Sequence, residues 1–467
     1  MSHAQVVAIA EIDAIVRERI APDGPGVAVA VTRAGRLIHS QGYGMAQVEW
    51  GQPITPDTVF GIGSLSKPFT ATAILLLRAE GKLALDDPIT RFLPDYDTHG
   101  QTITIHHLLT HTSGIPNFIT LPGFWESNVA RDHSHAEIRA RFEGLPLQFA
   151  PGERYSYNNS AYCLLGMVIE RLSGTAYGAF IRERIFAPLG MANSRYLEPH
   201  AIIPQRAEGY ASHAAARISA GGGGGEGDGA PDGYERARYM STTLQYAAGA
   251  LASTAADLAR WDLALGEGRL LDHETLAEML APTRLSAGSR AGQTVGYGMG
   301  WGLWGYRGRR AHGHAGGVPG YTSSYVRFDA DDLAIIVLSN RALFDSAGLA
   351  EPIAALLLDL PAPRHTPIAL PADALARMVG AYRSAIGDAL DITLRDGALR
   401  ASGELTADLL PTSETTCVCA HDPDREIHFA DEGPAGFERV TVQVPFYWFE
   451  VLRDHASERA ATAETGA

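Results

Sequence analysis

Strand patterns stand near both ends of the first 360 residues of this 467-residue chain, and helical patterns fill the sequence between them. Gly26 to Thr32 (GVAVAVT) and Leu37 to Ser40 predict two strands that turn at Ala34-Gly35. Far along the chain, Tyr321 to Phe328 and Leu333 to Ser339 predict a β-hairpin. Distant strands with helices between them pack most simply as one sheet. We therefore predict an α/β (α+β) domain at 1–360, whose antiparallel sheet is built from both chain ends.

The intervening sequence predicts a helical subdomain that is inserted into this sheet and flanks it. Runs of helix formers with apolar faces predict helices at Ser64 to Glu80, Ala161 to Leu172, Ala255 to Leu265, Asp272 to Leu280 and, after the hairpin, Leu343 to Leu358. The glycine-rich stretch at 219–233 predicts a flexible loop, because it has too few apolar side chains to pack. We expect a site in the cleft between the sheet and the inserted helices.

A change of composition after residue 360 predicts a second domain. Four prolines crowd residues 361–372 and predict a linker. From 373 to 454, short alternating patterns predict a small antiparallel β-barrel, with strands at 390–394, 404–410, 415–420, 425–430 and 438–452 and a two-residue turn at Asp396-Gly397. The polar, alanine-rich tail at 455–467 predicts disorder.

Ser64 and Lys67 stand three residues apart at the start of a predicted helix, in the sequence GSLSKPF. At that spacing the two side chains share one helix face. A hydroxyl beside an amine whose pKa is lowered by apolar surroundings is a nucleophile at neutral pH, and S-x-x-K is an acylation signature. An arbitrary S-x-x-K is more often a helix-capping serine with a solvated lysine. Ser66 is a rival nucleophile, but its partner three residues on is Phe69.

A second polar cluster, Tyr157-Asn158-Asn159, precedes the helix predicted at 161–172. A tyrosine hydroxyl in that place is able to shuttle a proton, and Asn159 is able to hold an amide oxygen. Taken alone, Tyr157 fits better a packed aromatic ring whose hydroxyl is satisfied elsewhere.

The sequence HGHAGGVPGY at 312–321 runs into the last predicted hairpin. Its glycines allow a substrate to approach the backbone closely, and His314 is able to stabilise charge or donate a proton. The H-x-H pair raises the alternative of a metal site, as do histidines at 106, 107, 111, 133 and 135. None of them has a recognised metal spacing with carboxylates, so we predict no metal and no other cofactor.

These motifs, in this order, resemble those of the serine β-lactamase and penicillin-binding-protein superfamily. The branch is that of class C β-lactamases, D-alanyl-D-alanine carboxypeptidases, D-aminopeptidases and related esterases. Ser64-Leu65-Ser66-Lys67 is similar to its first motif, Tyr157-Asn158-Asn159 to its Y-x-N motif, and His314-Ala315-Gly316 to the H-x-G that some members carry in place of K-T-G. Further similarity is found in the stretches 103–116, 164–166, 185–191 and 247–261.

The resemblance implies a β-lactamase/transpeptidase-like fold and acyl transfer. Ser64 would attack a carbonyl carbon and form an acyl-enzyme, which water or another nucleophile would release. Either Lys67 or Tyr157 would take the serine proton, and the sequence leaves that choice open.

The remaining site residues are also implied by the resemblance. Asn159 would contact the substrate amide, and His314 would stand where other members carry a lysine. Backbone N–H groups of the serine and of Gly317, next to Ala315 and Gly316, would bind the substrate and its oxyanion.

The H-x-G motif departs from K-T-G by removing a fixed positive charge that holds a substrate carboxylate. This favours an esterase, a D-aminopeptidase or a related amidase, and leaves a weak β-lactamase or D,D-carboxypeptidase as an alternative. The chain contains no G-x-S-x-G, which excludes an ordinary α/β-hydrolase. We predict a serine hydrolase that cleaves small esters or amides, among them peptides with D-amino acids.

The C-terminal domain resembles the lipocalin-like barrels that are appended to some of these hydrolases. Some penicillin-binding-protein-type thioesterases of this architecture cyclise peptides, so acyl transfer to an amine is an alternative function. A third alternative is a non-catalytic binding protein on the same fold. In the last predicted strand, we expect Arg453, or else another basic residue, to be available to a substrate carboxylate.

Charge and composition limit the partners. A formal net charge of −15 argues against nucleic-acid binding, and the longest apolar runs, at 73–77 and 333–338, are too short to span a membrane. Apolar and charged residues interleave near the N-terminus and predict an amphipathic helix rather than a signal peptide, so we expect a cytoplasmic protein with a small-molecule substrate. Three cysteines predict small buried side chains without disulfides. The oligomeric state stays open.

Overall fold

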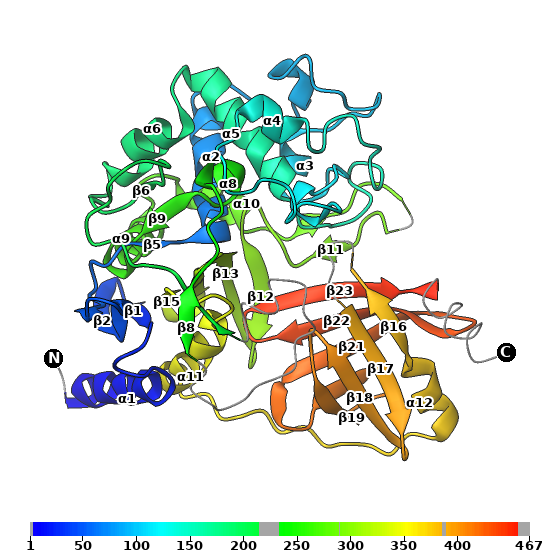
Figure 1. Cartoon of the computed structure of the whole chain (residues 1–467). Coiled ribbons are helices and arrows are strands. Elements are labelled where there is room, and N and C mark those ends of the chain that lie inside the picture. Colours follow the sequence, from blue (N-terminus) through cyan, green and yellow to red (C-terminus); the bar gives the residue numbers. More distant parts are fainter. Residues whose placement is uncertain (1–2, 214–232, 289, 385–388, 456–467) are drawn as a thin grey trace. The chain divides into compact units, whose positions relative to one another are not determined.

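The computed structural model describes residues 3–213, 233–288, 290–384 and 389–455 (Figure 1). The chain divides into two compact units, one formed by Met1–Leu303 with Arg309–Leu358 and the other by Trp304–Gly308 with Asp359–Ala467. The flexible loop predicted at 219–233 and the disordered tail predicted at 455–467 lie almost wholly outside the described residues.

One antiparallel sheet organises the first unit, in the strand order β12-β13-β14-β15-β1-β2. These strands are Gly302–Tyr306 (β12), Arg309–Val318 (β13), Tyr321–Phe328 (β14), Leu333–Ser339 (β15), Val27–Arg33 (β1) and Arg36–Tyr43 (β2). β1 pairs antiparallel with β15, so that Val27 lies opposite Ser339. The predicted sheet built from both chain ends is therefore confirmed.

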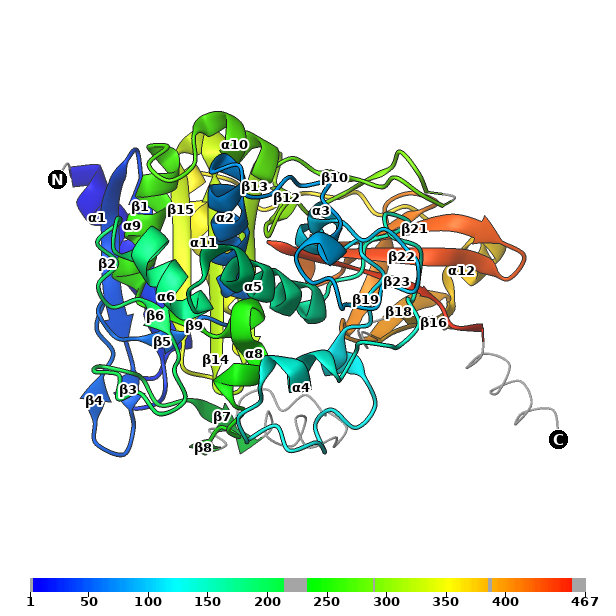
Figure 2. The same ribbon diagram turned by 90° about the horizontal axis from the view of Figure 1, so that it is seen from above.

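Helices cover both faces of this sheet (Figures 1 and 2). The helices α1 (His3–Arg19) and α11 (Ser346–Leu358) lie on one face, and α2 (Ser66–Ala79), α5 (Asn159–Ser173), α8 (Thr242–Gly249) and α9 (Ala255–Gly266) lie on the other. Six of the seven β1 residues and all seven β15 residues are buried. Because side chains alternate between the two faces of a strand, apolar side chains of β1 and β15 pack against both helical layers.

Shorter elements complete the first unit. The helices are α3 (Ile105–Leu109), α4 (His135–Arg139), α6 (Tyr177–Ile181) and α10 (His273–Met279), with the turns η1 (Gly63–Leu65), η2 (Ile89–Arg91), η3 (Phe118–Thr120), η4 (Arg182–Phe186) and η5 (Asp329–Asp331). The strands are β3 (Met45–Gln47), β4 (Gln52–Pro53), β5 (Phe60–Gly61), β6 (Arg195–Tyr196), β7 (Tyr210–Ser212), β8 (Tyr234–Arg236), β9 (Leu251–Ser253), β10 (Thr283–Arg284) and β11 (Thr294–Val295). All five predicted helices are present, with ends within three residues of those expected.

A buried carboxylate joins α9 to the sheet. Asp262 on α9 is fully buried and accepts hydrogen bonds from Thr32 (2.5 Å) on β1 and from Tyr325 (2.6 Å) and Arg327 (2.8 Å) on β14. A buried charge is tolerated only when it is paired and hydrogen-bonded. These contacts therefore fix the position of α9 on the sheet.

Replacing Asp262 by alanine should lower the free energy of unfolding by about 3–5 kcal/mol, because Arg327 stays buried and loses this partner. Urea denaturation of the full chain, followed by tryptophan fluorescence, measures the change. Arg91→Ala is a matched control, since the Arg91 side chain is 56% exposed in its ion pair and its loss should cost less than about 1 kcal/mol. An equally small loss in Asp262→Ala would contradict the assigned role.

The second unit contains a closed antiparallel barrel, which confirms the predicted fold of this region. Its strands are β16 (Gly380–Arg383), β17 (Ala389–Arg395), β18 (Ala398–Gly403), β19 (Ala407–Pro411), β20 (Thr416–Cys419), β21 (Asp422–Gly433), β22 (Gly436–Val444) and β23 (Tyr447–Arg453), preceded by helix α12 (Ala372–Met378). The two-residue turn at Asp396-Gly397 is confirmed by the pairing of Arg395 with Ala398. The single strand predicted at 438–452 is wrong. Apolar residues continue through a turn between β22 and β23, so the sequence pattern hides that turn.

Arg453 is not available to a substrate, contrary to the expectation. It is 8% exposed and donates hydrogen bonds to the carbonyl oxygens of Phe437 (2.9 Å) and Val379 (2.8 Å) and to the hydroxyl of Tyr382 (3.1 Å). The guanidinium of Arg453 therefore satisfies backbone groups inside the barrel unit.

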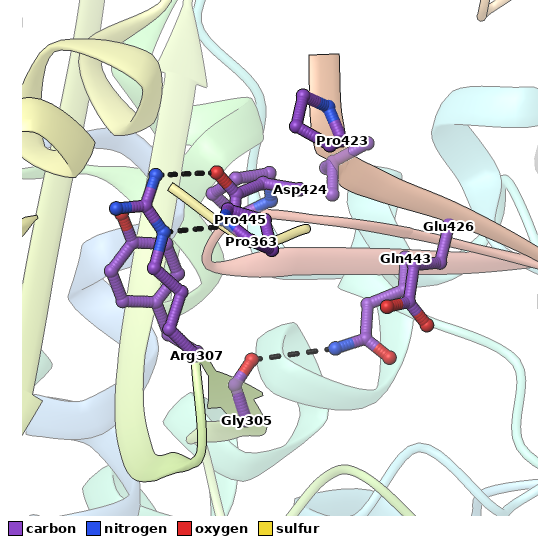
Figure 3. A pocket seen from close by; sticks show the side chains of 10 residues that line it. Gly305, Arg307, Pro363, Pro423, Asp424, Glu426, Gln443 and Pro445 are labelled. Atoms are coloured by element: carbon purple, nitrogen blue, oxygen red, sulfur yellow. Dashed lines mark hydrogen bonds and ion pairs between the residues drawn. The ribbon is translucent and has the colours of Figure 1, made fainter. Parts of the chain in front are cut away.

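A small polar pocket lies within the second unit (Figure 3). Arg307 binds both carboxylate oxygens of Asp424, at 3.0 and 2.6 Å, and donates to the carbonyl oxygen of Leu360 at 2.8 Å. Gln443 donates to the carbonyl oxygen of Gly305 at 3.3 Å, on the other side of the pocket. Because bidentate pairing holds an arginine in one geometry, the charge of Arg307 is used within the pocket itself.

Two simpler expectations concern the cysteines and the membrane. Cys163, Cys417 and Cys419 are free and buried, as predicted. Within the described parts of the chain, no helix has both the length and the apolar character needed to cross a bilayer.

Candidate active site

Ser64 lies on a tight turn directly before α2. It belongs to η1, whose first residue, Gly63, has a φ of +52° that favours glycine. A side chain on Gly63 would also come within 2.8 Å of the Gly317 nitrogen. The turn therefore requires a glycine at 63, and it leaves Ser64 partly exposed beside β13.

Lys67 reaches from the first turn of α2 to Ser64. Its Nζ lies 2.9 Å from Ser64 Oγ, 2.9 Å from Asn159 Oδ1 and 2.9 Å from the carbonyl oxygen of Ala248. The whole residue is buried. Burial lowers the pKa of Lys67 to about 7, an effect that the Cys163 thiol opposes. An amine that is partly neutral at pH 7 is thus in contact with the serine hydroxyl.

Ser66, the rival nucleophile, is directed into the protein. It is fully buried, and its Oγ accepts a hydrogen bond from the backbone N–H of Leu251 at 3.1 Å. Its hydroxyl therefore holds α2 against β9 and is closed to a substrate.

The carbonyl group that faces Lys67 follows a strained residue. Tyr246 has φ +38° and ψ −131° inside α8, a conformation that is costly for a bulky side chain. The next two carbonyl oxygens, of Ala247 and Ala248, accept hydrogen bonds from Thr70 (2.7 Å) and Lys67 (2.9 Å). The kink therefore directs two backbone acceptors toward α2.

Asn159 is held by a residue that the sequence analysis missed. Asn117 is 3% exposed, and its Oδ1 accepts hydrogen bonds from the backbone N–H of Asn159 (3.2 Å) and from Nδ2 of Asn159 (3.5 Å). Asn158 caps α5 by accepting from the N–H of Ala161 at 2.9 Å. The only sequence signal for Asn117 is an amide that follows a Ser-Gly-Ile-Pro turn, which is common in ordinary loops.

The ring of Tyr157 lies between Lys67 and His111. Its centroid is 4.7 Å from Lys67 Nζ and 4.4 Å from the centroid of the His111 ring. The structure thus brings Tyr157 together with Ser64 and Lys67 from a segment far away in the sequence.

The glycine-rich third motif is a strand, β13, and this element was not predicted. Gly316 is packed so closely that a Cβ would lie 2.0 Å from the carbonyl oxygen of Ile62, in the residue before η1. Ala315 and Gly317 alternate with it on the exposed face of β13. Glycine disfavours strands, so only the pairing of β13 with β14 reveals this element. The exposed edge of β13 therefore lies beside Ser64.

His314 is buried and neutral. Its Nε2 lies 3.0 Å from the hydroxyl of Tyr297, and its Nδ1 lies 2.5 Å from the carbonyl oxygen of Ala315. Burial, and then the positive charge of Lys67, lower the pKa of His314 to about 3. With both ring nitrogens in hydrogen bonds, His314 has no lone pair to offer a metal ion. The same contacts use both ring nitrogens of His314 inside the protein.

Tyr297 is a second residue that the sequence analysis missed. It comes from the segment after β11, is 4% exposed, and contacts His111 as well as His314. The surrounding sequence, VGYGMGW, contains no side chain that suggests chemistry by itself.

Comparisons with known proteins show the family of the chain. A family model described as "Beta-lactamase" matches residues 12–359, and the chain belongs to that family. It is similar to penicillin-binding protein 4* of Bacillus subtilis, with 30% identity over 401 residues that cover 83% of this chain and 86% of that protein. It is also similar to esterase EstB of Burkholderia gladioli, with 35% identity over 192 residues that cover 37% of this chain and 47% of that protein.

A solved structure extends the family to amidases. The D-amino acid amidase of Ochrobactrum anthropi, complexed with D-phenylalanine, matches with a TM-score of 0.62 and 29% identity, over 76% of this chain and 99% of that one. The family thus comprises serine hydrolases of small esters and amides, as the resemblance of the motifs implied.

The lowered pKa of Lys67 can be measured directly, because the chain has only two lysines, Lys67 and Lys82. In [13C]lysine-labelled protein we expect one ε-carbon signal to titrate with a midpoint near 7, since burial disfavours the charged amine. Lys67→Met assigns that signal by removing it, and an unchanged thermal unfolding transition shows that the variant is folded. A midpoint above 9 for Lys67 would contradict the assignment.

Proposed function

We propose that this protein is a serine acyl hydrolase that forms an acyl-enzyme on Ser64 and cleaves small esters or amides. The observation that carries the proposal is the buried amine of Lys67, which lies 2.9 Å from Ser64 Oγ and has a pKa lowered to about 7. Such an amine is able to accept a proton at neutral pH.

The contacts of Lys67 favour it as the base over Tyr157. A neutral amine has two N–H groups and one lone pair. Two acceptors that cannot donate, Asn159 Oδ1 and the Ala248 carbonyl oxygen, use the two N–H groups at 2.9 Å each. The lone pair is then left for the hydroxyl proton of Ser64. Tyr157, whose ring centroid lies 4.7 Å from Nζ, would relay that proton to the leaving group.

Backbone and amide groups near Ser64 would bind the substrate. The N–H groups of Ser64 and Gly317 come from adjacent segments and would hold the oxyanion, where one such donor is worth about 10²–10³-fold in rate. Because Asn159 Oδ1 is committed to Lys67, its Nδ2 would bind the substrate carbonyl. Ala315 and Gly316 would shape the edge of β13 along which the substrate lies.

The neutral His314 supports a substrate without a carboxylate at that position. A buried imidazole with a pKa of about 3 gives no positive charge at neutral pH. Together with the D-amino acid amidase among the similar structures, this favours D-amino-acid amides and small esters over β-lactams.

Intact-mass spectrometry tests the proposal after incubation with nitrophenyl esters, D-amino-acid amides and β-lactams. We expect an acyl adduct on Ser64, and a fall in turnover of at least about 10⁴-fold in Ser64→Ala. Ser66→Ala is the matched control, because its hydroxyl is buried, and it should keep the adduct. Full activity in Ser64→Ala, or no adduct with any compound, would overturn the proposal, and the second result would favour a binding protein.

A second candidate is acyl transfer to an amine of the same substrate, which would release a cyclic peptide. The closed barrel of the second unit favours it, since the sequence resembles peptide-cyclising thioesterases with such a domain. A peptidyl thioester mimic with a free amino terminus distinguishes the two. A cyclase should form ring product faster than acid, whereas a hydrolase should form mainly acid.

We also propose that the enzyme works in the cytoplasm. The three cysteines support this, because they are free thiols, as is usual in a reducing compartment. Recovery of the activity in the cytosolic fraction of the producing cell tests the location, and recovery in an exported fraction would contradict it.

A further inference from the structure

A continuous chain of hydrogen bonds runs behind the active site from α5 to β13. The backbone N–H of Asn158 lies 3.0 Å from Nδ1 of His111, and Nε2 of His111 lies 3.2 Å from the hydroxyl of Tyr297. The same hydroxyl lies 3.0 Å from Nε2 of His314, whose Nδ1 lies 2.5 Å from the carbonyl oxygen of Ala315. Both histidines and Tyr297 are at most 7% exposed.

The two ends of this chain of hydrogen bonds determine in which direction each proton is donated. A backbone N–H only donates, so Nδ1 of His111 is the acceptor, and the neutral ring carries its proton on Nε2. A carbonyl oxygen only accepts, so Nδ1 of His314 carries the proton, and its Nε2 is the acceptor. The hydroxyl of Tyr297 therefore accepts from His111 and donates to His314. Both ends require the same direction.

Neither histidine is charged in these surroundings. Burial, followed by Lys67, lowers the pKa of both rings, to about 3 for His314 and well below the ordinary value for His111. The titratable groups that face them are Lys67 on α2, Tyr162 on α5, and three further tyrosines, Tyr155, Tyr157 and Tyr297.

Tyr162 is the competing acceptor for the Tyr297 proton. Its hydroxyl borders Tyr297 and itself donates to the carbonyl oxygen of Leu109 at 2.8 Å. If Tyr297 donated to Tyr162, the unprotonated Nε2 of His314 would face an oxygen lone pair at 3.0 Å. Donation from Tyr297 to His314 removes that repulsion.

We infer that Tyr297 is a positioning residue, which holds His314 as the neutral Nδ1–H tautomer and directs its only proton to the Ala315 carbonyl. His314 then supplies neither a positive charge nor a proton to the substrate. Because His314 is neutral, no second positive charge lies beside Lys67 when the lysine is protonated. The charge and the proton position of His314 therefore depend on the hydroxyl of Tyr297, which contacts no reacting atom.

This inference rests on the proposed acyl transfer only for its effect on rate, since the tautomers are measurable without a substrate. Nitrogen–proton correlation spectra of the full-length protein with [15N]histidine report the protonated nitrogen of each ring. The variants His111→Gln and His314→Gln assign the two signals among the 17 histidines. At pH 7 we expect His314 as Nδ1–H and His111 as Nε2–H. The opposite tautomer at either ring, or a charged His314, would overturn the inference.

Tyr297→Phe tests the role of the hydroxyl. The Nε2 signal of His314 should lose the shift of a hydrogen-bonded nitrogen, and the pH at which His314 is protonated should rise by about one unit or more, because a donor to the neutral form is gone. We expect kcat/KM to fall about 10–100-fold, with most of the change in kcat.

Tyr196→Phe is the matched control. It removes a tyrosine hydroxyl from β6, which takes no part in this chain of hydrogen bonds, and it should leave the His314 signal unchanged. If the His314 signal and its titration are the same in Tyr297→Phe as in the unmodified protein, Tyr297 has no positioning role, whatever the activity. If the unmodified protein shows the expected tautomers but is not acylated on Ser64, the result would count against the proposed function alone.

Discussion

The burial of one lysine amine is the constraint on which the site depends. Lys67 has no exposed surface, so each of its hydrogen bonds must come from the protein. Three segments supply them: η1 through Ser64, the start of α5 through Asn159, and the strained end of α8 through Ala248. The same burial keeps the amine partly neutral near pH 7, and so the packing of the fold and the basicity of the lysine have one cause.

The sheet contributes the other wall of the site. Close contact between η1 and β13 is possible because Gly63 and Gly316 have no side chains at positions where a Cβ would strike the opposing backbone. Buried polar side chains support both walls: Asn117 accepts hydrogen bonds from Asn159, and the hydroxyl of Tyr297 contacts both His111 and His314. The candidate site residues are thus supported by polar residues that are themselves buried and hydrogen-bonded, as precise positioning requires.

Local sequence signals predicted much of this arrangement. The continuous apolar runs of β1 and β15 and the long apolar helices α2 and α5 were clear, because a strand that is buried on both faces, like a buried helix, needs such a run of apolar residues. Ser64 and Lys67 were found because their spacing lies within one helix turn. Other parts lacked a local signal. β13 is rich in glycine, the turn between β22 and β23 is apolar, and Asn117 and Tyr297 act only through partners that are distant in sequence.

The sequence by itself determined the order of the elements, the sheet from both chain ends, the barrel and the three motifs, because periodicity and short spacings are local properties. The tertiary structure added that Ser66, the serine that spacing had disfavoured, is buried and accepts a hydrogen bond from the backbone of Leu251. It also decided that His314 is neutral and that Arg453 is internal to the barrel unit. Charge and proton position depend on burial and on hydrogen-bond partners, and these exist only after distant segments have packed together.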